Sequence, residues 1–289
     1  MSAAPPPQAG HPSEKPAPSA GIRLMMRRIF AVALNTFREA VRNRVLAILF
    51  LFALGMMSFS LVLGELSIHE EVRIIKDLGL AGISLFGLAI ALFLGVNLLA
   101  KELEKKTVYA VLPKPIRRWE FLVGKYLGLV ATITVVVVLM SLFVAAMLLF
   151  EGAAVDSVFV RAEVLVWLEL MLVVAVAMVF NSFSSPYLSA MFTAALWVIG
   201  RNTGELEAFA TTKLKGQPVG MLLEWVVRIV PDFRMFFVSG ANLGGDGILS
   251  IHERFVTWGY VASAGGYAAL YVVTCLVAAS LLFERRDFT

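Results

Sequence analysis

The chain has 289 residues, of which 59% are hydrophobic and only 16% are charged, and its mean hydropathy is +0.83. Soluble domains carry about 25% charged residues, so a water-soluble protein with an ordinary polar surface is excluded. We therefore predict an integral membrane protein whose apolar surface faces lipid.

The net charge is +4 at pH 7 and the isoelectric point is about 9.3. In a membrane protein, such an excess of basic residues more often marks the cytoplasmic side and its anionic lipid headgroups than a nucleic-acid site. We expect membrane lipids, and no nucleic acid, as partners. The single cysteine, Cys275, lies in an apolar run, which excludes a disulfide within the chain and predicts a small buried side chain.

The N-terminal region divides into a tail and a helix. Residues 1–21 are rich in proline, alanine and serine, which predicts a disordered tail before one membrane domain over residues 22–289. The tail has no apolar stretch with a cleavage site, so no signal peptide is expected. Residues 22–44 predict a basic amphipathic helix in the membrane interface, which either anchors the N-terminus or also forms a docking surface. Its apolar stripe comprises Met26, Phe30, Leu34, Phe37 and Val41.

Six apolar segments are candidates to cross the membrane, because about 20 apolar residues span a bilayer as a helix. They are residues 45–63, 78–100, 126–150, 164–180, 187–200 and 260–283. The fifth is short and follows Pro186, so it either crosses with help from residues 182–185 or forms a broken helix. We thus predict an all-α fold with six transmembrane helices and both termini on one side.

The distribution of lysine and arginine predicts the orientation. With a cytoplasmic N-terminus, 16 of the 25 basic residues lie inside, and most of the others fall in one long loop where charge counts for little. Both termini are therefore expected in the cytoplasm, with the protein in the cytoplasmic (inner) membrane.

The long loop, residues 201–259, would then lie outside. Residues 222–230 predict a second amphipathic or partly re-entrant helix, followed by a turn at Pro231-Asp232-Phe233. The glycine-rich residues 244–247 predict another turn. Asp246 could suggest calcium, but the segment lacks the regular ligand spacing of a calcium loop, so a plain turn is favoured.

The sequence contains little that could support catalysis. Its three histidines, His11, His69 and His252, do not pair at metal-ligand spacing, and no HExxH motif occurs. No phosphate-cradling GxxxxGK[ST] loop is present, so the chain is not expected to hydrolyse ATP. We predict no catalytic, metal or cofactor-binding residues in this chain.

Residues 101–125 form a basic segment between the second and third predicted spans. Pro113 and Pro115 are expected to interrupt the chain, and residues 116–123 then predict a short helix on the cytoplasmic face. Such a helix could fit into a cleft of a motor subunit and transmit the movement of that subunit to the membrane domain. Alternatively, the segment is only a solvated basic loop that sets the topology.

This segment resembles the pattern E…T…LL…P…R…F…GK of permease subunits of ABC-2-type ATP-binding-cassette exporters. The matching residues are Glu102, Thr107, Leu112, Pro115, Arg117 or Arg118, Phe121, Gly124 and Lys125. The sequence of residues 106–128 is most similar to the subgroup that includes the nitrous-oxide-reductase maturation permease. That subgroup is also similar to this chain at residues 181–186, 231–233 and 283–288. Many members have glycine where Lys106 stands, so the turn before Thr107 is expected to be helical here. The resemblance covers residues 24–289.

The resemblance implies a six-helix permease domain, two copies per transporter, and a separate cytosolic ATPase pair that binds ATP and magnesium. The N-terminal helix and the short cytoplasmic helix would contact the ATPase. The residues assigned to this coupling are Glu102, Thr107, Leu112, Pro115, Arg117, Arg118, Glu120 and Lys125. The resemblance leaves the cargo open.

Glu169 is the carboxylate deepest inside a predicted span, and an unpaired charge in lipid is costly. It either lines a translocation path or dimer interface together with Asn97, or it lies near the headgroups because the span begins later. Asn97 and Asn181 are otherwise expected to hydrogen-bond between helices.

Two other classes of function remain open at this point. One is a membrane scaffold that moves nothing, and the other is a membrane enzyme acting on lipid or quinone. Co-purification with an ATP-hydrolysing subunit separates the transporter from both.

Overall fold

The computed structural model describes residues 18–65, 71–104, 117–214, 217–237, 241–242, 248–249 and 256–284. Over these residues the fold is helical, apart from one short pair of strands. The helices are α1 (Pro18–Val41), α2 (Arg44–Glu65), α3 (Glu71–Glu104), α4 (Arg118–Phe150), α5 (Ser157–Phe183), α6 (Pro186–Arg201), α7 (Thr203–Thr212), α8 (Pro218–Ile229) and α9 (Trp258–Glu284). A 3-10 turn, η1 (Phe233–Phe236), and the strands β1 (Ala241–Asn242) and β2 (Ile248–Leu249) lie between α8 and α9.

Five of these helices are long and apolar enough to cross a membrane, namely α2, α3, α4, α5 and α9. The fifth predicted span corresponds to α6, which has only 16 residues and is therefore about 24 Å long. Because the hydrocarbon core is about 30 Å thick, α6 alone is too short to cross it without tilting or thinning the bilayer. The described residues thus support a multi-pass membrane protein with five spans, and the predicted sixth is not confirmed.

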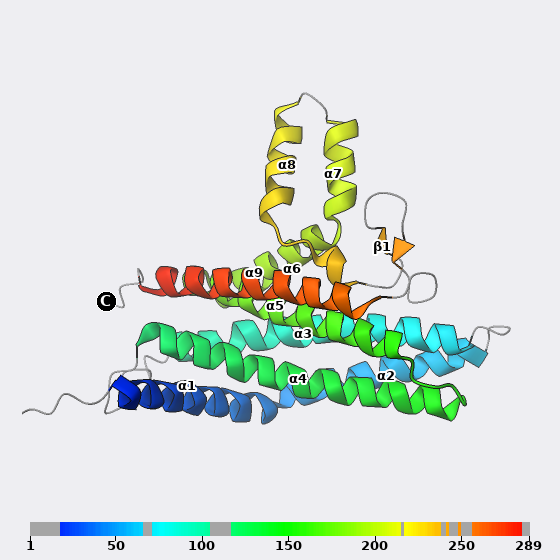
Figure 1. Ribbon diagram of the computed structural model, residues 1–289, viewed down its shortest axis with the longest axis horizontal. Helices are drawn as coiled ribbons and strands as arrows, with labels where there is room; N and C mark the ends of the chain where they lie inside the picture. The colour runs from blue at the N-terminus through cyan, green and yellow to red at the C-terminus, as the bar shows by residue number, and fades with distance from the viewer. Residues whose placement is uncertain are drawn as a thin grey trace, which may run out of the picture.

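Helix α5 lies at the centre of the bundle and contacts α3, α4, α6 and α9. Residues 172–178 are all buried, in a run of leucine, valine, alanine and methionine that leaves no polar face. Figure 1 shows α3, α4, α5 and α9 side by side, and the hairpin of α7 and α8 pointing away from them. Helices α2 and α9 instead expose apolar side chains such as Leu51 and Leu270, as expected for surfaces that face lipid.

Helix α1 packs along the first half of α4. Its predicted place in the membrane interface stays a prediction. Two glycines of α4 allow this close approach. A Cβ atom at Gly124 would lie 2.8 Å from Cβ of Val32, and one at Gly128 would lie 2.5 Å from the carbonyl oxygen of Ala33. Small residues spaced four apart are typical of helices whose backbones pack closely in membranes.

The predicted apolar stripe of α1 largely faces away from α4. Met26 and Phe30 are 58% and 68% exposed, whereas the buried face is formed by Ile29, Thr36 and Ala40. The helix therefore has one face against protein and a second apolar face available to lipid.

Three other expectations concern the segments that connect the spans. The separate short helix predicted over residues 116–123 is wrong for the part described, because α4 begins at Arg118 and continues unbroken to Phe150. The amphipathic helix predicted over residues 222–230 corresponds to α8, which pairs with α7. The turn predicted over residues 244–247 lies outside the described residues, although the strands beside it pair antiparallel, with Ala241 opposite Leu249.

Candidate functional site

Glu169 is fully buried in the middle of α5. The helix begins at Ser157, so twelve residues, or about 18 Å of helix, separate its N-terminal end from Glu169. The helix begins before the predicted span, and the candidate membrane-spanning segment Ser157–Phe183 includes Glu169. A charged group at this depth requires a partner, because isolated ions are costly to bury.

Three side chains from two other helices surround the Glu169 carboxylate. Nη1 of Arg201 lies 2.6 Å from Oε1, and Nε1 of Trp197 donates a hydrogen bond to the same oxygen at 2.8 Å. The hydroxyl of Ser84 on α3 donates to Oε2 at 3.3 Å. Because both carboxylate oxygens have partners, the cluster joins α3, α5 and α6 through buried polar contacts.

Arg201 was missed as a site residue because the sequence placed it at the start of the outside loop. It is the last residue of α6, and its guanidinium lies 5.0 Å from the ring centre of Trp197 and 3.8 Å from that of Phe237. Stacking on aromatic rings stabilises an arginine side chain that is partly removed from water. The signal available in the sequence was the spacing of Trp197 and Arg201, four residues apart on one face of a short helix.

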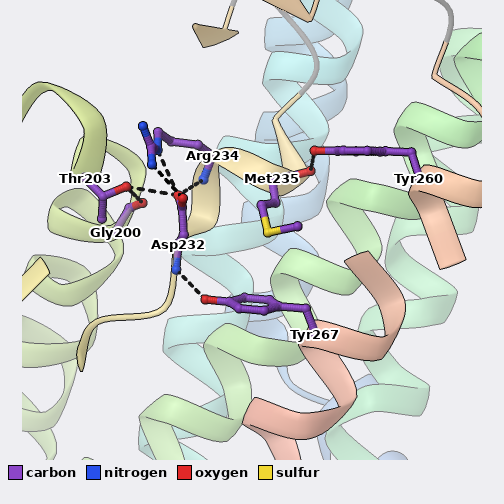
Figure 2. Close-up of polar contacts among 7 residues, drawn as sticks. All are labelled: Gly200, Thr203, Asp232, Arg234, Met235, Tyr260 and Tyr267. Carbon is purple, nitrogen blue, oxygen red and sulfur yellow. Dashed lines mark hydrogen bonds and ion pairs between the residues drawn. The ribbon is translucent and has the colours of Figure 1, made fainter. Parts of the chain in front are cut away.

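The predicted Pro231-Asp232-Phe233 turn forms a second polar cluster next to the end of α6. Figure 2 shows Asp232 accepting hydrogen bonds from Thr203 and Arg234, while its backbone N–H donates to the hydroxyl of Tyr267. The Asp232–Arg234 ion pair is bidentate in character, with N–O distances of 2.9 and 2.7 Å. The cluster therefore connects the start of α7 and the turn η1 with α9.

The backbone of α6 approaches this turn closely at Gly200. A Cβ atom there would lie only 2.4 Å from the carbonyl oxygen of Pro231 and 2.5 Å from the ring of Phe233. Any larger residue would push the turn away from α6. Gly200 thus fixes the position of the neighbouring Arg201 relative to the Asp232 cluster.

Burial alone would raise the pKa of the Asp232 carboxyl, but the hydrogen bonds and charge of Arg234 outweigh it and lower the pKa. The stabilisation from a lowered pKa is fully present above the pKa of an unfolded aspartate, about 3.9, and is lost as the pH falls through the folded value. Asp232 is therefore ionised and paired at neutral pH.

Replacing Asp232 with alanine is expected to lower the free energy of unfolding by roughly 1–3 kcal/mol, because Arg234 and Thr203 both lose their acceptor. Denaturant titration of the purified protein in detergent measures this loss, which should shrink as the pH is lowered toward 3. The exposed Glu205 on α7 provides a matched control, and Glu205→Ala should change little. Equal effects of the two substitutions would contradict the role of this turn.

The predicted coupling residues that are described lie in two different settings. Arg117 is exposed just before α4, and Arg118 is half-buried in its first turn. In contrast, Glu120 is 4% exposed and Lys125 is 1% exposed. Glu120 pairs with Arg28 of α1 at 3.6 Å, so it contributes to the contact between α1 and α4.

The remaining predicted residues are placed only in part. Asn97 and Glu102 belong to the last two turns of α3, and Thr107, Leu112 and Pro115 lie outside the described residues. Asn181 donates to the carbonyl oxygen of Val96 at 3.0 Å, which confirms the expected hydrogen bond between helices.

Comparison with protein families gives a match over most of the chain. Residues 30–288 match the family model described as ABC-2 family transporter protein, which covers nearly the whole membrane domain. A comparison with curated proteins finds no significant match.

Proposed function

The chain belongs to the ABC-2 family of transporter proteins, and from that premise we propose that it is the permease subunit of an exporter powered by a separate ATPase. Members of this family typically lack an ATPase domain of their own and act with an ABC ATPase. In this proposal the chain carries the cargo path, and the partner binds ATP and magnesium.

The observation that carries the proposal is the buried ion pair between Glu169 and Arg201. An apolar side chain at either position would pack in this bundle without the desolvation cost of an ion. Ionisable groups inside membrane spans more often serve a transport path than stability. We assign the pair, with Ser84 and Trp197, to the translocation path or to the interface that borders it.

A second copy of the chain is proposed to complete the transporter by covering α6 and α8. Tyr187 and Met191 on α6 are 86% and 66% exposed, and Trp225 and Ile229 on α8 are 65% and 70% exposed. These apolar side chains extend from the short helix α6 to a hairpin that projects from the bundle (Figure 1). A homodimer would bury this surface and place the two Glu169–Arg201 pairs on either side of a shared path.

The proposed ATPase-contacting surface is the end of the bundle where α3 finishes and α4 starts. It comprises Arg117 and Arg118, together with the pattern residues Glu102, Thr107, Leu112 and Pro115. The resemblance of this segment to the subgroup of the nitrous-oxide-reductase maturation permease supports a place among those permeases, with the cargo left open.

Replacing Arg117 with glutamate is expected to weaken assembly with the ATPase by roughly ten- to a hundred-fold, because a charge-assisted contact contributes about 1.5–3 kcal/mol. Pull-down of the ATPase subunit and permease-stimulated ATP hydrolysis measure this effect. Lys15→Glu, a charge reversal in the N-terminal tail, is the control. If both variants retain the ATPase equally, Arg117 contributes to topology alone.

The proposed orientation places both termini in the cytoplasm, which requires the short helix α6 to cross the membrane in addition to the five candidate spans. A reporter fused after Thr289 is therefore expected to be active in the cytoplasm, and one inserted at Gly245 is expected to be active outside. Paired alkaline phosphatase and fluorescent-protein fusions measure the two positions. A cytoplasmic signal from the Gly245 insertion would reverse the proposed direction of α9.

A further inference from the structure

A groove between α4 and α5 lies apart from the ion-pair cluster and encloses about 420 Å³. Its walls are mostly apolar and include Val138, Leu142, Val160 and Trp167. Val138 and Leu142 are 50% and 61% exposed, so the groove opens at the surface that faces lipid. An apolar cavity with few polar groups is typical of a site for a small or amphiphilic ligand.

Glu163 provides the ionisable group of this groove. Its Oε1 atom is buried and has no hydrogen-bond partner, while the hydroxyl of Ser141 hydrogen-bonds to the carboxyl group. The other polar side chains that line the groove have partners, since Nε1 of Trp167 donates to Thr134 at 2.9 Å and Thr134 donates to the carbonyl oxygen of Val130 at 2.8 Å. One carboxylate oxygen thus remains available to a donor that occupies the groove.

The depth of Glu163 suits a lipid headgroup. The 27 residues of α5 make a helix about 40 Å long, which matches a bilayer with its headgroup regions. Glu163 is six residues from Ser157, or about 9 Å from that end, which places it just inside the boundary between headgroups and acyl chains. A lipid could therefore place its chains against the valines and leucines and its headgroup at the carboxylate.

We infer that the α4–α5 groove binds a membrane phospholipid with a primary ammonium headgroup, through Glu163. A carboxylate only accepts hydrogen bonds, and an ammonium group offers three donors and the opposite charge. A choline headgroup has the same charge but no N–H, so it cannot satisfy Oε1. The groove should therefore distinguish ethanolamine lipids from choline lipids that carry the same acyl chains.

Native mass spectrometry of the delipidated full chain, titrated with dioleoyl phosphatidylethanolamine or dioleoyl phosphatidylcholine, tests this site. We expect the unaltered chain to retain the ethanolamine lipid about ten-fold better, as for the gain of one charge-assisted hydrogen bond. Glu163→Gln should abolish the preference, and Glu205→Gln, at an exposed position on α7, should keep it. Ala145→Phe, which fills the groove, should reduce binding of both lipids.

Equal retention of the two lipids by the unaltered chain, or a preference that persists in Glu163→Gln, would overturn the inference. A second measurement needs no variant. A phosphatidylethanolamine with a photoreactive group near its headgroup should crosslink to peptides covering residues 134–145 and 155–167. Crosslinks confined to other helices would place the lipid elsewhere and reject this groove.

Discussion

Replacement of Arg201 with methionine is expected to destabilise the protein by about 3–5 kcal/mol, because it leaves the fully buried Glu169 carboxylate without its counter-ion. Denaturation of the purified protein in detergent, followed by tryptophan fluorescence, measures the loss. The matched control is Arg73→Met, which breaks the exposed pair between Arg73 and Asp77 at 3.9 Å. Exposed pairs contribute about 0–1 kcal/mol, so this control should remain near the stability of the unaltered protein.

The double variant Glu169→Leu with Arg201→Met separates stability from transport. Removing both charges leaves no unpaired ion, and such replacements of buried pairs are often neutral or stabilising. We expect the double variant to regain most of the stability that Arg201→Met loses, and to show no ATP-driven transport. Full transport by a stable double variant would show that the pair serves the fold alone.

Replacement of Gly128 with leucine is expected to separate α1 from α4. A Cβ atom at this position already lies 2.5 Å from the carbonyl oxygen of Ala33, and backbone atoms cannot move aside as a flexible side chain can. Overpacking of this kind typically costs about 1–3 kcal/mol, which is enough to open a helix that contacts the bundle along one face. The ATPase should then be retained poorly as well, because the loss of the Glu120–Arg28 contact removes the support of α1 from the end of α4 that carries Arg117 and Arg118.

Thiol labelling at Thr36 measures the separation directly. Thr36 is 1% exposed on the face of α1 that meets α4, so a Thr36→Cys probe in a Cys275→Ala background should resist maleimide in the otherwise unaltered protein. It should become reactive in Gly128→Leu. Gly55→Leu is the matched control, because nothing lies within 4 Å of a Cβ atom at Gly55. Continued protection in Gly128→Leu would mean that α1 does not depend on this contact.

The placement of α1 shows which part of the fold the sequence could predict. Its helical periodicity was clear, and an apolar stripe that includes Met26 and Phe30 was expected to face the membrane, but the close packing of α1 against α4 was not foreseen. In a membrane, lipid is as apolar as a leucine side chain, so large residues can face outward while small ones allow backbones to approach. The informative pattern was Gly124 and Gly128, four residues apart, which lie opposite Val32 and Ala33 of α1.

The sequence predicted one half of the candidate site, Glu169, and missed the other half, Arg201. Glu169 stood out because a lone carboxylate in an apolar span is conspicuous. Arg201 did not stand out, because a basic residue that follows a short apolar segment usually marks the start of a polar loop. Only the packing of α6 against α5 brings the two charges within 2.6 Å. Short helices such as α6 give weak sequence signals because their ends depend on tertiary contacts.

The lengths of α3 and α4 have a mechanical consequence. With 34 and 33 residues, each is about 50 Å long, some 20 Å more than the hydrocarbon core requires. If α4 crosses with the apolar segment predicted from the sequence, residues 126–150, the surplus falls at the end that carries Arg118, Glu120 and Lys125, where α1 packs against it. A tilt of about 10° around the membrane boundary would move this end sideways by about 3 Å. In such a movement the paired helices would act as a lever arm, in which a small displacement at the end of α4 rotates the buried segments beside α5.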